Sequence, residues 1–229
     1  MLIFRIILVE PMYSGNIGSV ARVMKNLGFK ELILVNPCEL DFHARQMAMH
    51  AFDIIENSKI VSSIKEAVQD SNLIVGTTGL RGKHIRMPAL TPSQLREKLA
   101  NKNGVISIVF GRENDGLRNH ELKLCDLIVS IPTSKEYPSM NLSHAIAIVL
   151  YELSKVEGGD ITLAKHSDLE LLYKHLDEVL EDIEYKQHKK HRTKLMLRRI
   201  LGRAELTEGE VQTLRGVLRS IQWKLRKQE

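Results

Sequence analysis

The chain has 229 residues, of which 43% are hydrophobic and 27% are charged, and its formal net charge is +5. This composition is ordinary for a globular protein, argues against a disordered chain and leaves enough apolar surface for a core. No apolar run reaches the roughly 18 residues that span a bilayer, and the opening MLIFRIILVE is interrupted by charges, so we expect neither a membrane segment nor a cleaved leader. Cys38 and Cys125 have no CxxC spacing and are expected to be reduced thiols in the cytoplasm.

Short runs rich in Ile and Val predict buried strands, and segments with helical periodicity lie between them. In chain order, the strands are expected at 2–9, 31–36, 72–78, 104–111 and 126–132. The intervening helices are expected at 16–27, after Ser62, after Thr91-Pro92, and at 141–153. The repeated order of strand and helix predicts an α/β domain over residues 1–155, with a mostly parallel sheet.

After the Gly158-Gly159 break the strand signal stops, and residues 160–229 are expected to form an all-α extension. Helices are predicted at 166–189, 192–202 and 207–227, and Thr207 and Glu210 have the spacing of a capping box. Residues 160–185 contain eight acidic and two basic side chains, whereas residues 186–229 contain thirteen basic and four acidic ones. We expect the two stretches to pair within the chain or between subunits.

Small and polar residues follow several of the predicted strands, at the edge where parallel sheets bind ligands. Three corners stand out, EPMYSGNIGSVARVMKNLGF, FGRENDGL and IPTSKEYPSMNLSHAIAIVLYEL, and GTTGLRGKHIRMP is a weaker fourth. Taken singly, each corner has a simpler explanation. The glycines could serve tight turns, Arg22 could be a solvent-exposed arginine of a helix, and Glu113 could be a carboxylate at the start of a helix, near the positive end of its dipole. A nucleotide fold would also suit the strand pattern, but neither GxGxxG after the first strand nor GxxxxGK[ST] is present.

In combination, the three corners resemble the motifs of SPOUT-class RNA methyltransferases of the TrmH branch. The matching residues are Asn16-x-Gly18-x-x-x-Arg22, then FGRENDGL, then Ile131-Pro132 with Ser139-Met140-Asn141-Leu142-Ser143. The resemblance covers about residues 2–155. The tail RRILGRAELT, with Leu214-Arg215-Gly216, is similar to the TrmJ subgroup, which implies methylation of a ribose 2′-hydroxyl in tRNA, at nucleotide 32 of the anticodon loop, on cytidine, with uridine left open as a second base.

The resemblance implies a deep trefoil knot at the end of the α/β domain, an exception to the rule that connections do not thread loops. It also implies that the knotted loops bind S-adenosylmethionine, without a metal. The residues that would contact this cofactor are Thr77, Thr78, Gly79, Gly111, Ile131, Pro138, Ser139 and Met140. Finally, it implies a homodimer with a composite site, in which Arg22 of one subunit faces the cofactor of the other.

The implied reaction moves a methyl group from a sulfonium to a ribose hydroxyl, which is a poor nucleophile until it is deprotonated or oriented. Arg22 is the candidate for activating this hydroxyl. Because arginine stays protonated, stabilisation of the developing alkoxide is preferred to a role as general base. Ser139 and Asn141 are expected to hold the ribose or the arginine, and Asn16 and Glu113 are expected to brace the site.

Two basic segments are candidates for RNA contact. Arg81, Lys83 and Arg86 either form a solvated charged loop or grip phosphates. The run KQHKKHRTKLMLRRILGR carries eight Lys or Arg and no acid, which favours contact with a phosphate backbone; its candidates are Lys189, Lys190, Arg198 and Arg199. The expected function is tRNA 2′-O-methylation in the cytoplasm. The alternatives are a 2′-O-methyltransferase for ribosomal RNA or another tRNA position, and a non-catalytic RNA-binding SPOUT protein.

Overall fold

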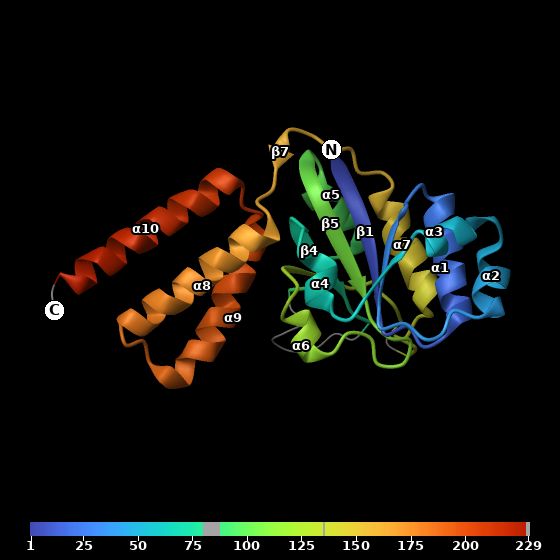
Figure 1. Ribbon diagram of the computed structural model, residues 1–229, viewed down its shortest axis with the longest axis horizontal. Helices are drawn as coiled ribbons and strands as arrows, with labels where there is room; N and C mark the ends of the chain where they lie inside the picture. The colour runs from blue at the N-terminus through green and yellow to red at the C-terminus, as the bar shows by residue number, and fades with distance from the viewer. Residues whose placement is uncertain (80–87, 135, 228–229) are drawn as a thin grey trace.

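The computed structural model describes residues 1–79, 88–134 and 136–227. It contains a parallel-sheet α/β part followed by a helical C-terminal part (Figure 1). The strands of the sheet lie in the order β3-β2-β1-β5-β4-β6, and their bounds are β1 (Leu2–Val9), β2 (Glu31–Val35), β3 (Lys59–Val61), β4 (Leu73–Thr77), β5 (Lys102–Phe110) and β6 (Leu127–Val129). Each neighbouring pair runs parallel.

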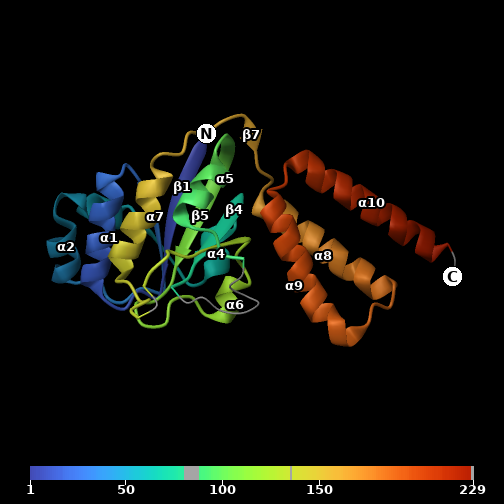
Figure 2. The same ribbon diagram turned by 180° about the vertical axis from the view of Figure 1, so that it is seen from behind.

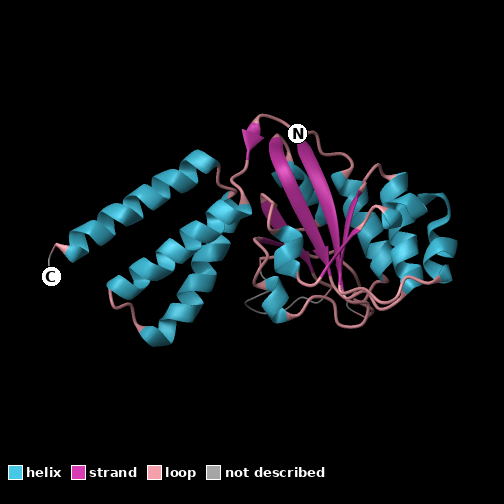
Figure 3. Ribbon diagram, in the orientation of Figure 1, coloured by secondary structure: helices cyan, strands magenta, loops and turns pink. Residues whose placement is uncertain are grey.

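Helices cover both faces of this sheet (Figure 3). One face is covered by α1 (Ser14–Asn26), α3 (Phe52–Glu56), α5 (Pro92–Leu99) and α7 (Leu142–Leu153), and α2 (Phe42–Ala48) and η1 (Met49–Ala51) pack on α1. The other face packs against α4 (Ile64–Val68) and α6 (Asn119–Leu122). In β1, Ile6 and Leu8 enter the first core while Ile7 and Val9 enter the second, which is why residues 6–9 are apolar without alternation. Burying each such side chain contributes about 1.5–3 kcal/mol.

The C-terminal part consists of α8 (His166–Asp182), α9 (Gln187–Ala204) and α10 (Glu208–Arg226). Helix α8 lies between α9 and α10 (Figure 2) and packs against both. A separate apolar cluster, which includes Leu172, Val179 and Leu218, fills this part. The predicted capping box is confirmed, because Thr207 Oγ1 accepts from Glu210 N and the Glu210 side chain accepts from Thr207 N.

The predicted break between the first two C-terminal helices is wrong. It was expected after residue 189, but α8 ends at Asp182 and α9 begins at Gln187. The chain turns at Glu184, which has φ +51°. A glutamate in the left-handed region is unfavourable by about 1–2 kcal/mol and gives no sequence signal for a turn, which explains the error.

Several contacts fix the helical part against the α/β part. The short strand β7 (Ile161–Thr162) pairs with the start of β5. Asn72 Nδ2 donates to the Leu163 carbonyl oxygen at 2.7 Å, and Lys98 Nζ donates to the Arg203 carbonyl oxygen at 2.9 Å. None of the described helices is long and apolar enough to cross a membrane.

Asp126 is a buried carboxyl at this junction, only 3% exposed. Its Oδ2 accepts from Ile74 N at 3.0 Å, and its Oδ1 has no hydrogen-bond partner. Burial raises the pKa of this carboxyl to about 6, above its value of about 4 in an unfolded chain. Ionisation of Asp126 therefore lowers the free energy of unfolding. This loss of stability is complete above about pH 6 and vanishes as the pH falls to about 4.

We expect Asp126→Asn to raise the free energy of unfolding at about pH 8 by roughly 1–3 kcal/mol. The amide keeps an oxygen acceptor for Ile74 N and carries no charge. Urea unfolding of both proteins at about pH 8 and about pH 4.5 measures the effect, and the gain should shrink at the lower pH. An equal gain in the free energy of unfolding at both pH values would exclude burial of the Asp126 charge as the cause.

Candidate active site

Three loops meet beyond the carboxyl ends of β4, β5 and β6 and enclose a cavity of about 190 Å³. This is the edge at which parallel sheets bind ligands. The structure brings all the predicted cofactor residues to this one cavity, namely Thr77, Thr78, Gly79, Gly111, Ile131, Pro138, Ser139 and Met140. They are far apart in the chain, and the parallel order of the three strands is what gathers them.

The cavity combines apolar walls with a polar rim. Phe110, Val129, Leu142 and Val149 supply the walls, and Glu113 and Asp115 supply carboxylates. The Thr77 hydroxyl donates to the Val109 carbonyl oxygen at 3.0 Å, which fixes the end of β4 against β5. Such a cavity suits a ligand with one flat apolar group and one cationic group.

The loop after β5 folds back on itself beside the cavity. Arg112 N donates to the Gly116 carbonyl oxygen at 3.3 Å, and Gly116 N donates to the Arg112 carbonyl oxygen at 3.0 Å. Gly116 has φ +64°, a conformation that favours glycine. A Cβ at Gly111 would lie 2.0 Å from the Gly116 carbonyl carbon, so the fold of this loop requires glycine at position 111.

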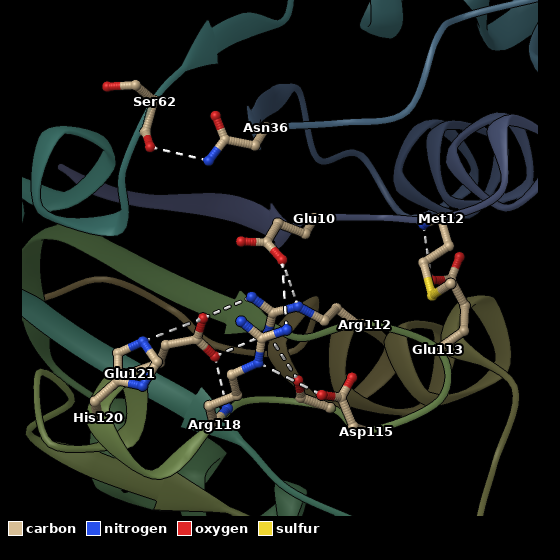
Figure 4. A network of polar contacts seen from close by, with 11 residues as sticks. Glu10, Met12, Asn36, Ser62, Arg112, Glu113, Asp115, Arg118, His120 and Glu121 are labelled. Atoms are coloured by element: carbon tan, nitrogen blue, oxygen red, sulfur yellow. Dashed lines mark hydrogen bonds and ion pairs between the residues drawn. The ribbon is translucent and has the colours of Figure 1, made fainter.

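A buried arginine holds this loop to the rest of the domain (Figure 4). Arg112 donates from Nη1 and Nη2 to the two carboxylate oxygens of Glu121, at 3.0 and 2.8 Å, and from Nε to Glu10 at 2.7 Å. Arg112 and Glu121 are each 5% exposed. Arg112 was not among the predicted site residues, although it lies inside the FGRENDGL motif and is followed by Glu121, the buried acid of α6.

We expect Arg112→Met to lower the free energy of unfolding by about 3–5 kcal/mol, because it leaves the Glu121 carboxylate buried without its charge partner. Denaturant unfolding at neutral pH measures the loss. The double variant Arg112→Met, Glu121→Leu removes both charges and should recover much of that stability. If the double variant is as unstable as the single one, the uncompensated charge is not the cause.

Asn16 and Glu113 are in direct contact. Asn16 Nδ2 donates to Glu113 Oε1 at 2.8 Å, and Met12 N donates to Glu113 Oε2 at 3.0 Å. These bonds tie the start of α1 to the loop after β5, as the labelled Met12 and Glu113 in Figure 4 illustrate. Both side chains, together with Asn141 and Ser19, line a second hollow next to the cavity.

Asn141 is the N-cap of α7, and its Oδ1 accepts from Ser143 N at 2.9 Å. Ser139 is exposed at the rim of the main cavity. Arg22 is exposed on α1, one turn beyond Ser19, and lines neither hollow. Within one chain, therefore, Asn16, Glu113, Ser139 and Asn141 lie together, while Arg22 lies outside the group.

The basic segment of α9 is partly neutralised by the acidic helix before it, as expected from the two charge blocks. Lys190 pairs with Glu181 at 2.7 Å, Lys194 pairs with Asp177 at 2.9 Å, and Arg198 pairs with Glu170. Arg198 also stacks over the Tyr173 ring at 4.5 Å.

These contacts bear on the predicted RNA-binding residues, whose contact with RNA stays a prediction. The side chains of Lys190 and Arg198 are 12% and 17% exposed and pair with carboxylates of α8, so RNA would compete with these ion pairs. Arg199 is buried at the junction between the two parts. Lys189 is exposed, as is Arg192, one turn further along α9. Arg81, Lys83 and Arg86 lie outside the described residues.

Comparison with known proteins gives two family matches. Residues 3–151 match the SpoU rRNA Methylase family, and residues 167–229 match the tRNA methyltransferase TrmJ, C-terminal domain. Among the described residues, no group of three or more His, Cys, Asp or Glu side chains could hold a metal ion.

Individual relatives match over nearly the whole length. The chain is 43% identical over 219 residues to the tRNA (cytidine-2′-O-)-methyltransferase TrmJ of Methanocaldococcus jannaschii, covering 91% of this chain and 95% of that protein. It is 37% identical over 233 residues to the tRNA (cytidine/uridine-2′-O-)-methyltransferase TrmJ of Pectobacterium atrosepticum, covering 95% and 96%.

The crystal structure of TrmJ from Z. mobilis ZM4 superposes with a TM-score of 0.80 at 31% identity, covering 96% of this chain and 99% of that one. This likeness includes the helical part, because it extends over both segments of the chain. The family match, the identity and the fold agree, and the chain belongs to the SpoU methylase family and, within it, to the TrmJ tRNA 2′-O-methyltransferases.

Proposed function

We propose that this protein transfers a methyl group from S-adenosylmethionine to a ribose 2′-hydroxyl of tRNA, at nucleotide 32 of the anticodon loop, on cytidine and uridine. The observation that carries the proposal is the convergence of three loops, with all the predicted cofactor residues, on one cavity. The full-length similarity to TrmJ proteins supports tRNA as the substrate and cytidine and uridine as the bases.

The residues around the cavity fit S-adenosylmethionine. The apolar side chains of Leu142 and Val149 suit the adenine ring of the cofactor, and the carboxylates of Glu113 and Asp115 suit the cationic groups of the cofactor. When bound, this cofactor supplies an electrophilic methyl group. The Gly111 backbone lies directly against the Gly116 turn, so this loop is closely packed on itself beside the cavity.

The chain itself must orient the ribose. Glu113 anchors the start of α1, because its carboxylate accepts hydrogen bonds from Asn16 Nδ2 and Met12 N. The Asn141 Oδ1 accepts hydrogen bonds from the backbone N and the hydroxyl of Ser143, in the first turn of α7. Asn141 lines the second hollow and Ser139 lines the main cavity, and we propose the Asn141 amide and the Ser139 hydroxyl as hydrogen-bond donors to the ribose. A guanidinium beside the 2′-oxygen would stabilise the charge that develops on it.

That guanidinium is Arg22 of a second subunit in the proposed homodimer. Arg22 is exposed and lines neither hollow of its own chain. Apolar side chains are exposed nearby, with Met12 and Tyr13 at the start of α1 and Ile148 and Tyr151 on α7, and α1 and α7 pack side by side (Figure 1). An exposed apolar face of this kind suits a symmetric contact with a second copy.

The proposed knot involves the same loops. Residues 111–117, which follow β5, line the cavity together with Ile131, Thr133, Pro138, Ser139 and Met140, which follow β6. In the sheet, β5 and β6 lie on either side of β4. We infer that the segment after β6 passes through the loop after β5, as a deep trefoil knot in residues 1–155, and that residues 160–229 recruit the tRNA. The tRNA substrate favours a cytoplasmic location.

The test is incubation of the purified protein with total tRNA and S-adenosylmethionine that carries a labelled methyl group, followed by location of the methylated nucleotide. Label on the ribose of nucleotide 32 supports the proposal. Label on ribosomal RNA, or at another tRNA position, would assign a different substrate. Absence of transfer by a folded protein that binds RNA would indicate a non-catalytic role.

The exposed cations of α9 give a prediction for tRNA binding. Lys189 and Arg192 have no carboxylate partner among the described residues. Replacing both by Gln should reduce the slope of log affinity against log salt by about 1.4–1.8, because each lost phosphate contact removes about 0.7–0.9. A binding titration across a salt series measures it. The matched control Lys190→Gln, at a lysine already paired with Glu181, should change the slope much less.

A further inference from the structure

Trp223 is the single tryptophan of the chain, and it lies in the last turn of α10 with 61% of its surface exposed. Helix α10 packs against α8 through the side that carries the buried Val211 and Leu218. Trp223 follows Leu218 by five residues, which is about 140° around the helix, so it faces away from α8. It lines neither hollow of the candidate active site.

The surface around Trp223 is basic. Residues 211–227 contain five Lys or Arg and no acid. Arg219 precedes Trp223 by four residues and Lys227 follows it by four, which places the three in one row along the helix. Arg226 is exposed beside this row. Among the described residues, no carboxylate forms an ion pair with these three cations, in contrast to the lysines of α9 that α8 neutralises.

The Trp223 ring already attracts a cation. Lys227 Nζ lies 3.9 Å from the ring centre, and the ring is 61% exposed with this contact in place. The other exposed apolar side chains of α10, Val217 and Ile221, lie on different sides of the helix, about 120° and 200° from Trp223. The surroundings of the ring are therefore cationic rather than apolar. An aromatic ring among cations is the combination that binds single-stranded nucleic acid, because bases stack on the ring and phosphates meet the charges.

We propose that Trp223 stacks on an unpaired base of tRNA, while Arg219 and Arg226 contact phosphates next to that base. The inference rests on tRNA as the proposed substrate. Stacking tolerates any base, since every base has a π-face, so this contact adds affinity without selecting the nucleotide that is methylated. Helix α10 extends away from the α/β part (Figure 1), so it would hold the tRNA at a second point, apart from the candidate active site of the same chain.

The test begins with tryptophan fluorescence, which reports on Trp223 alone. We expect tRNA to quench this fluorescence to saturation in the full-length protein. A fully paired RNA duplex, which offers no unstacked base, should leave it nearly unchanged.

Filter binding of tRNA over a salt series then separates stacking from charge. Trp223→Leu should raise the Kd for tRNA about five-fold or more, equal to about 1 kcal/mol, and should leave the salt slope unchanged because no charge is lost. Trp223→Phe keeps an aromatic face and should retain most of the affinity. Arg219→Gln should lower the slope by about 0.7, the value for one single-strand phosphate contact. The matched control is Ile221→Ala, on the other side of α10, which should change neither quantity.

Four results would overturn the proposal. Equal Kd values for Trp223→Leu and the wild type would reject the stacking contact, as would equal losses in Trp223→Leu and Trp223→Phe. Quenching by the duplex as strong as by tRNA would show that no unpaired base is needed. Conversion of dimers to monomers by Trp223→Leu in sedimentation, with an unchanged Kd for tRNA, would assign the ring to a protein contact. These results reject this site alone, whereas a wild type that neither binds nor methylates tRNA rejects the proposed function as well.

Discussion

Gly111→Val is expected to raise the Kd for S-adenosylmethionine by about 100-fold or more, which is about 2.7 kcal/mol. A Cβ at this position would lie 2.0 Å from the Gly116 carbonyl carbon, 2.2 Å from Leu117 N and 2.3 Å from the Gly116 carbonyl oxygen. These are backbone atoms of a turn that cannot move aside as a flexible side chain can. Valine adds two further methyl groups, so the loop that forms one side of the cavity must open.

Calorimetric titration with S-adenosylmethionine measures this effect, and circular dichroism establishes that the variant is folded. Gly216→Ala is the matched control. It lies within α10, and no atom lies within 4 Å of its Cβ position, so it should stabilise the helix by about 0.5–1 kcal/mol and leave cofactor affinity unchanged. Unchanged affinity in folded Gly111→Val would show that the cofactor binds somewhere else.

Sequence patterns predicted the strands that are buried on both faces. β1, β2, β4, β5 and β6 each carry consecutive apolar residues because each contributes side chains to two cores. The short elements were missed. In β3, Lys59 and Ile60 are exposed and only Val61 is buried, so it carries no strand pattern. The small helices α2 and α3 follow Asp41 without a long apolar repeat, and they form because they pack on α1.

The candidate site was predictable to the extent that its motifs are local. The residues in GTTG, FGRENDGL and PSMN lie next to one another within each motif, and the parallel sheet brings the motifs together. The position of Arg112 between Glu10 and Glu121 depends on tertiary packing, because Glu10 lies 102 residues away. The basic run of α9 shows the same limit. Composition cannot distinguish exposed Lys189 from Arg198, which α8 covers through Glu170 and Tyr173.

Arg22→Ala is expected to slow methyl transfer by roughly 10²–10³-fold or more, the loss that follows removal of a charged donor from a developing oxyanion. Its cofactor affinity should stay within about three-fold of wild type, or about 0.7 kcal/mol, because Arg22 lies outside the cavity of its own chain. Single-turnover rates with tRNA and a calorimetric titration with S-adenosylmethionine separate the two quantities. Loss of cofactor binding in folded Arg22→Ala would contradict the assigned role.

Mixing this variant with Gly111→Val tests whether the site is shared between subunits. Each protein alone should be inactive, since one lacks the arginine and the other lacks the cofactor cavity. In a mixed dimer, Arg22 of the Gly111→Val subunit would face the intact cavity of the Arg22→Ala subunit and restore one site in two. With equal amounts and random exchange, half of the dimers are mixed, so activity should recover to about a quarter of wild type. If mass-tagged subunits exchange and activity does not return, Arg22 acts within its own chain and the composite site is wrong.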